Sequence, residues 1–121
     1  MDAILGVHGR VATALVLYYA AVGAWALWLG VRNTGPTPGL RGAIAIAVIA
    51  SVVQGALGVA VFVLGRPPQD SLHLLYGVTL VVAMPLAASL VRDRSARAQS
   101  FALGLAALFT AGLAIRGIIT A

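Results

Sequence analysis

The sequence predicts an all-α membrane protein, a bundle of four transmembrane helices that run alternately up and down. Its composition is the first observation: 61% of the 121 residues are hydrophobic, 9% are charged, and the mean hydropathy is +1.02, whereas a soluble domain carries about 25% charged residues. The second observation is a set of four apolar runs, each long enough for a hydrocarbon core that needs roughly 20 helical residues. The third is that polar turn residues and charges separate these runs.

The four predicted helices span about residues 4–31, 42–65, 71–91 and 100–119, and they form a single domain over residues 1–121. Trp25 and Trp28, near the far end of the first, are typical of membrane-interface anchors. The second is rich in glycine and alanine, which let helices or a flat cofactor approach closely. The third contains Pro85, which membrane helices tolerate because neighbours can satisfy the freed carbonyl. The fourth again carries small residues and then Arg116 near its end.

The connections set the topology. Segment 32–41 holds asparagine, glycines and two prolines, and therefore predicts a loop. The turn at Pro67 and Pro68 is short, so the second and third helices should be antiparallel neighbours. Segment 92–97 is the most charged part of the chain and predicts the last loop.

Cysteine and charge usage exclude several classes of protein. The chain has no cysteine, which excludes disulfides, thiolate metal sites and a haem attached through thioethers. Eight arginines, no lysine and three aspartates give a pI near 11.2. In a soluble protein this balance would indicate a nucleic-acid partner. Here the arginines flank apolar runs, as membrane proteins place them, so lipid is the expected partner and nucleic acid is not.

The distribution of arginines also predicts an orientation. Five of them flank the two loops at one end of the bundle, and three lie toward the other end: Arg32, Arg41, Arg92, Arg94 and Arg97 against Arg10, Arg66 and Arg116. The positive-inside rule places the five in the cytoplasm. Both termini and both histidines then face outward, most simply across a prokaryotic cytoplasmic membrane.

The two histidines are the candidate metal ligands. His8 and His73 lie near the starts of the first and third helices, which run in the same direction and sit diagonally across a four-helix bundle. Counted from the arginines at the opposite end, they lie roughly 36 Å and 28 Å along their helices, a mismatch that a tilted or projecting first helix absorbs. Two facing imidazoles suit both axial positions of a non-covalent haem b. Zinc or non-haem iron would need further ligands.

Other residues near the histidines have candidate roles. Arg10, Arg66 and Arg116 would pair with the haem propionates. Tyr76 shares a helix face with His73, where it either orients the imidazole or only packs. Gln54 makes an interhelical hydrogen bond or, as the less favoured alternative, contacts a cofactor.

Each of these residues also has a simpler interpretation than haem binding. Gly58 leaves room for a porphyrin or for helix packing. Histidines at helix ends often bind only water or lipid, and flanking arginines often only snorkel. Ionisable residues inside membrane spans are nevertheless a functional hypothesis by default.

The order Gln54…Leu57-Gly58…Val61…Gly65-x-Pro67…Leu72-His73-Leu74 resembles the haem A synthase family, and Val7-His8-Gly9-Arg10 resembles that family's first-helix histidine segment more loosely. Those enzymes have eight helices in two similar four-helix halves. The resemblance covers about half their length, and it implies that His8 and His73 are axial ligands near the outer face. The glutamate that the enzymes place shortly before the first histidine has no counterpart, because this chain contains no glutamate.

Three functions remain open at this stage. The first is a small b-type cytochrome that transfers single electrons, alone, as a homodimer or within a larger respiratory or photosynthetic membrane complex. The second is a half-size oxidoreductase of the haem A synthase type that acts on haem as a dimer. The third is a haem-free accessory subunit. The sequence favours the first and therefore a protein without enzymatic activity, because bis-histidine ligation closes both axial positions.

Overall fold

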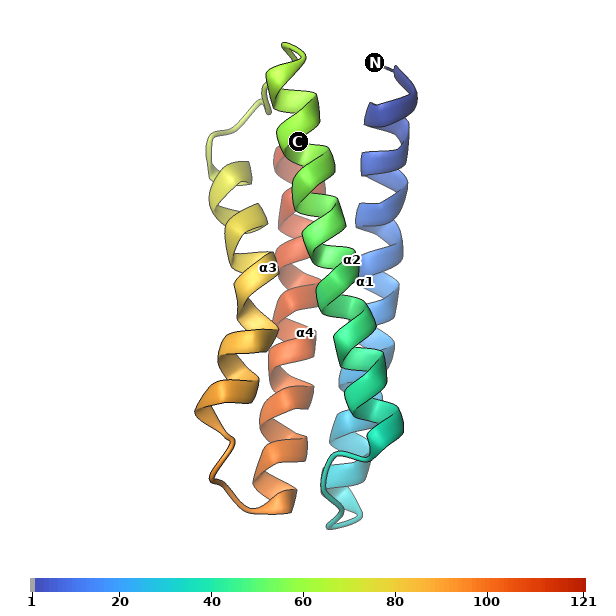
Figure 1. The fold of residues 1–121 in the computed structure, drawn as a ribbon, viewed down its shortest axis with the longest axis vertical. Coiled ribbons are helices and arrows are strands. Elements are labelled where there is room, and N and C mark those ends of the chain that lie inside the picture. The colour runs from blue at the N-terminus through green and yellow to red at the C-terminus, as the bar shows by residue number, and fades with distance from the viewer. Residues whose placement is uncertain (1) are drawn as a thin grey trace.

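Four helices, joined by short loops, make up the computed structural model, which describes residues 2–121 (Figure 1). They are α1 (Asp2–Val31), α2 (Pro38–Val63), α3 (Leu72–Leu90) and α4 (Ala96–Thr120). All four are long and apolar enough to cross a membrane. The predicted fold class is confirmed: the chain is an all-α membrane protein with an up-down-up-down bundle.

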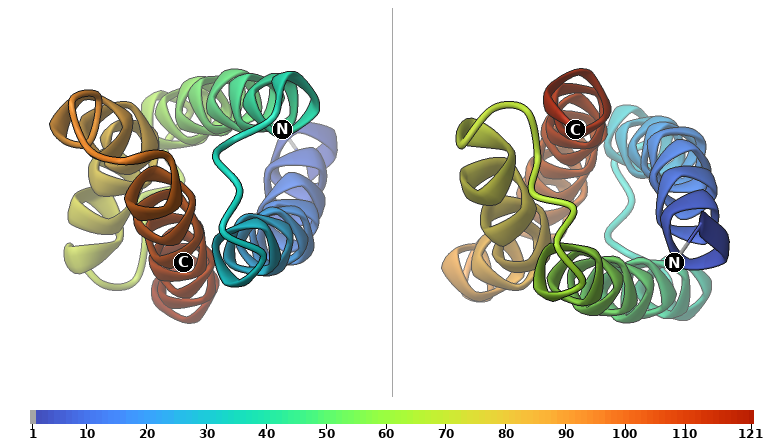
Figure 2. Two further views of the ribbon diagram at one scale, coloured as in Figure 1. Left: turned by 90° about the horizontal axis from the view of Figure 1, so that it is seen from below. Right: turned by 90° about the horizontal axis from the view of Figure 1, so that it is seen from above.

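The helices occupy the corners of a square when the bundle is viewed from either end (Figure 2). α1 packs against α2 and α4, and α3 packs against the same two neighbours, so α1 and α3 are diagonal partners. One end carries loops 32–37 and 91–95 and is called the loop end below. The other carries both chain ends and the α2–α3 turn, and is called the histidine end (Figure 1).

α1 and α4 make the closest helix pair, and glycines allow it. A Cβ added at Gly23 would lie 2.8 Å from the Leu108 side chain, and one at Gly104 would lie 2.8 Å from the Leu27 side chain. Without a hydrophobic driving force between helices in lipid, such close backbone packing holds the bundle together. Large side chains such as Leu17 and Val63 point outward and are strongly exposed, as lipid-facing residues should be.

Two helices begin earlier than the sequence analysis predicted. α2 starts at Pro38 rather than near residue 42, because Thr37 caps it by accepting a hydrogen bond from Leu40 N and proline suits the first helical position. α4 starts at Ala96 rather than near residue 100, because Ser95 accepts a hydrogen bond from Ala98 N. In both cases the polar composition obscured a helix start.

Candidate functional site

The two histidines meet at the histidine end of the bundle. His8 lies in the second turn of α1 and His73 in the first turn of α3. Their ring centroids are 6.1 Å apart, with an angle of 69° between the ring planes, and both residues are half-buried. The predicted mismatch in depth is absorbed because α1 projects beyond α3. α1 is 30 residues long and extends past the 19-residue α3 at both ends (Figure 1).

The His73 imidazole is oriented by α4. Its Nδ1 lies 2.8 Å from the carbonyl oxygen of Gly117 and 3.2 Å from Oγ1 of Thr120. A carbonyl can only accept, so Nδ1 carries the proton and donates it. The Thr120 hydroxyl donates to the carbonyl of Arg116 at 2.8 Å, which leaves its lone pairs for His73. In the neutral ring the Nε2 lone pair is then free to bind a metal, and carbonyl partners of this kind commonly fix ligand histidines.

The His8 imidazole lies against a glycine of α2. A Cβ added at Gly58 would lie 3.2 Å from Cε1 of His8, closer than ordinary contacts. One turn away, Nε2 of Gln54 donates a hydrogen bond to the carbonyl oxygen of His8 at 2.9 Å, so the predicted interhelical bond is present. Gly58 therefore makes room for the ring, while Gln54 fixes the backbone that carries it.

Two polar atoms beside His8 are buried and lack partners. Within residues 2–121, neither His8 Nδ1 nor Gln54 Oε1 has a hydrogen-bond partner. An unpaired buried donor or acceptor costs about 1–3 kcal/mol. Such atoms are few in native proteins and each calls for an explanation. A bound group would supply the missing interactions only if it donated a hydrogen bond to Oε1, which is an acceptor, and contacted Nδ1.

The predicted propionate partners and Tyr76 take different positions. Arg116 lies over the Tyr76 ring, with its guanidinium carbon 5.6 Å from the ring centroid. Arg66 forms an exposed ion pair with Asp2 at 3.4 Å. Arg10 is exposed, and its side chain makes no hydrogen bond or ion pair in the described part of the chain. Tyr76 does not orient His73, because Gly117 and Thr120 occupy that role.

The two groups of α4 that orient His73 were not predicted from the sequence, although Arg116 of the same helix was. Gly117 acts through its backbone carbonyl, which no sequence motif reveals. Thr120 was visible only as a hydroxyl in the last turn of an apolar helix. Spacing along the sequence indicates only the neighbours of His73 within α3, whereas the orienting groups come from the helix packed next to it.

The described residues 2–121 contain no cluster of three or more histidine, cysteine or acidic side chains. The site therefore offers two imidazole nitrogens and no further strong protein ligand. Comparisons of the chain with protein-family models, curated proteins and solved structures found no match. The functional conclusion consequently depends on the geometry of the site.

Proposed function

We propose that this chain is a membrane b-type cytochrome that holds one haem between α1 and α3 through His8 and His73 and transfers single electrons. One observation carries the proposal: two histidines 65 positions apart in sequence have ring centroids 6.1 Å apart across the bundle. Ionisable side chains within membrane spans are rare and are functional by default.

The distance between the imidazoles fits a single metal ion between them. A metal–imidazole nitrogen bond is about 2.0–2.1 Å, and the ring centroid lies about 1.2 Å beyond the nitrogen. Two imidazoles on opposite sides of one metal therefore have centroids roughly 6.5 Å apart. The observed 6.1 Å is about 0.4 Å shorter than this.

The surroundings of the two rings support ligation as well. His73 has a fixed tautomer with Nε2 free, and His8 has a buried Nδ1 without a partner. Gly58 leaves the space beside His8 that any larger residue would take. His8 and His73 would hold a haem from both sides, and a haem held by two imidazoles would supply electron transfer rather than oxygen chemistry.

Arg116 is the best-placed cation for a haem propionate. Its backbone carbonyl accepts from Thr120, and the next residue, Gly117, accepts from His73, so Arg116 belongs to the same turn that orients the ligand. Arg66 would have to exchange Asp2 for a propionate, which an exposed ion pair allows at little cost. Arg10, with no partner in residues 2–121, is free to do the same.

The arginine distribution supports an orientation with the histidine end outward. Five arginines lie at the loop end and three toward the histidine end, and the positive-inside rule places the larger number in the cytoplasm. The haem and its redox partners would then meet at the outer surface of a prokaryotic cytoplasmic membrane. A homodimer or a larger membrane complex would use the lipid-facing helix surfaces.

The absorption spectrum of the detergent-purified protein, expressed with ample haem, tests the proposal. We expect a Soret band and a sharp α band after reduction, and loss of both in His8→Ala and in His73→Ala. Thr79→Ala serves as a control in α3, because its hydroxyl only bonds the carbonyl of Leu75. Circular dichroism shows whether each variant remains helical. A colourless, folded wild-type protein would contradict the proposal and leave an accessory subunit.

The half-size enzyme of the haem A synthase type remains the alternative hypothesis. The shared feature is one histidine on the first helix and one on the third of a four-helix unit. Haem A in extracts of cells that make the protein, and none in cells without it, would favour the enzyme over the electron carrier.

A further inference from the structure

A groove opens between α2 and α3 at the loop end, far from the histidines. Two adjoining cavities of about 430 and 330 Å³ share Arg41, Pro85, Ala88 and Leu103 in their walls. α2 and α3 diverge toward this end (Figure 1), and α4 contributes Leu103 between them. The groove follows α2 from Arg41 to Ile49, a length of about 12 Å at the rise of an α-helix.

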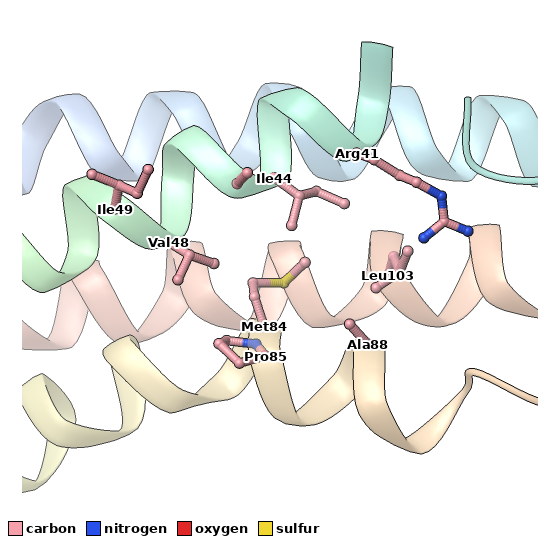
Figure 3. A pocket seen from close by; sticks show the side chains of 9 residues that line it. Arg41, Ile44, Val48, Ile49, Met84, Pro85, Ala88 and Leu103 are labelled. Carbon is pink, nitrogen blue, oxygen red and sulfur yellow. The ribbon is translucent and has the colours of Figure 1, made fainter. Parts of the chain in front are cut away.

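The groove changes from apolar to cationic along its length. Figure 3 shows Ile44 and Val48 of α2 facing Met84 and Pro85 of α3, with the guanidinium of Arg41 at the loop end. The second cavity adds Arg92 and Gln99 at that end. An occupant must therefore combine an apolar chain with a polar head at the level of the membrane surface.

The cations at the mouth of the groove are not neutralised by the protein. The ion pair of the described chain is Arg66 with Asp2, at the other end, and no carboxylate lines either cavity. Nη2 of Arg41 donates to Oε1 of Gln99 at 3.1 Å, and Nε2 of Gln99 donates to the carbonyl of Arg92 at 3.3 Å. Gln99 thus fixes the Arg41 guanidinium at the mouth and, through the backbone carbonyls of Arg92 and Arg94, the adjoining loop, while most guanidinium donors remain available.

We propose that this groove binds one anionic phospholipid, with its phosphate at Arg41 and Arg92 and one acyl chain along Ile44, Val48 and Met84. Basic pockets between transmembrane helices recognise anionic headgroups in this way, and the planar guanidinium of arginine can bind two phosphate oxygens at once. A neutral lipophile would leave two arginines without a counter-charge. The site is independent of the haem proposal, because it lies at the opposite end of the bundle.

Native mass spectrometry of the protein in non-ionic detergent, titrated with phosphatidylglycerol or phosphatidylcholine, tests this site. We expect one phosphatidylglycerol to bind at least about fivefold more tightly than phosphatidylcholine, since one surface arginine is worth about that factor toward an anionic lipid. The double variant Arg41→Gln/Arg92→Gln should lose roughly 25-fold in affinity for phosphatidylglycerol by the same reasoning.

A matched control separates the groove from general attraction to a basic surface. Arg32→Gln/Arg94→Gln removes the same charge at the same end, but neither residue lines either of the two cavities. It should change the affinity much less than the groove variant does, because a charge that does not contact the bound phosphate is screened at physiological salt. An equal loss in both double variants, or equal binding of the two lipids by the wild type, would overturn the proposal.

A steric pair tests the acyl-chain part of the groove. Ala88→Phe fills the space shared by both cavities without changing charge, and should abolish retention of phosphatidylglycerol. Ala14→Phe makes the same change on an exposed position of α1 and should leave binding intact. Unchanged binding in a folded Ala88→Phe variant would place the lipid elsewhere and refute the assignment.

Discussion

Gly58 and Gly55 offer a direct test of how the His8 imidazole is held. Both lie in α2, three residues apart, so alanine at either position should raise helix propensity equally. The added methyl groups differ in what they meet. At Gly58 the Cβ would lie 3.2 Å from His8 Cε1, whereas at Gly55 it would lie 3.5 Å from Val81 Cγ2, an ordinary van der Waals contact. The pair therefore isolates the space beside the imidazole.

The expected loss of haem affinity in Gly58→Ala follows from how far the His8 imidazole must move. In Gly58→Ala the ring has to retreat by a few tenths of an ångström, and turning a side chain about 30° from its rotamer costs about 0.5–1.5 kcal/mol. Such a cost corresponds to a roughly two- to tenfold weakening of haem binding. We expect haem to be lost faster by that factor in Gly58→Ala and at the wild-type rate in Gly55→Ala.

The assay is the rate at which the purified protein gives up haem to an excess of a soluble haem acceptor, followed at the Soret band. Circular dichroism confirms that both variants keep their helices. Equal rates of haem loss in the two variants would refute the role of Gly58 as the space for the His8 ring. A wild-type protein without haem would instead contradict the proposed function itself, so the two failures are distinguishable.

Two further predictions concern hydroxyl groups in the bundle. Thr120→Val removes one hydrogen-bond acceptor from His73 Nδ1 and should raise the haem reduction potential by roughly tens of millivolts in a redox titration. The reason is that a less electron-rich imidazole stabilises the oxidised iron less. Thr110→Val is the control and should not shift the potential, because Thr110 is a buried threonine of α4 that bonds only its own helix. The hydroxyl groups of Tyr19 and Ser51 are 2.6 Å apart. A double-mutant cycle of Tyr19→Phe and Ser51→Ala, measured by unfolding in detergent, should give a coupling energy of about 0.6 kcal/mol, which is typical of hydrogen bonds in membrane proteins. A coupling energy of zero would mean that this contact does not stabilise the bundle.

Most of the fold could be predicted from the sequence because the hydrocarbon core of a membrane restricts which backbone structures can cross it. A backbone in hydrocarbon must satisfy its own hydrogen bonds, so apolar runs of sufficient length have to be helices. Short connections then make sequential helices antiparallel, and the diagonal placement of α1 and α3 follows. The errors fell at the starts of α2 and α4, where Thr37 and Ser95 cap helices inside segments that look like loops.

Only part of the candidate site could be predicted from the sequence, for a different physical reason. The histidines could be named from their rarity in membrane spans, and their approach followed from topology. The orientation of His73 depends on Gly117 and Thr120, which reach it through a helix contact rather than a sequence interval. The groove at Arg41 depends on how far two helices diverge, and the sequence did not predict it.

The histidine end contains polar groups that packing alone does not require. His8 Nδ1 and Gln54 Oε1 are both buried and unpartnered within residues 2–121, and each costs about 1–3 kcal/mol in that state. A leucine at position 8 would avoid the cost at His8, and alanine at Gly58 would favour the helix. The chain instead combines an imidazole, an amide and a glycine at one point opposite a second imidazole of fixed tautomer. A ligand that binds there would offset this cost, and a helix contact serving only stability would not.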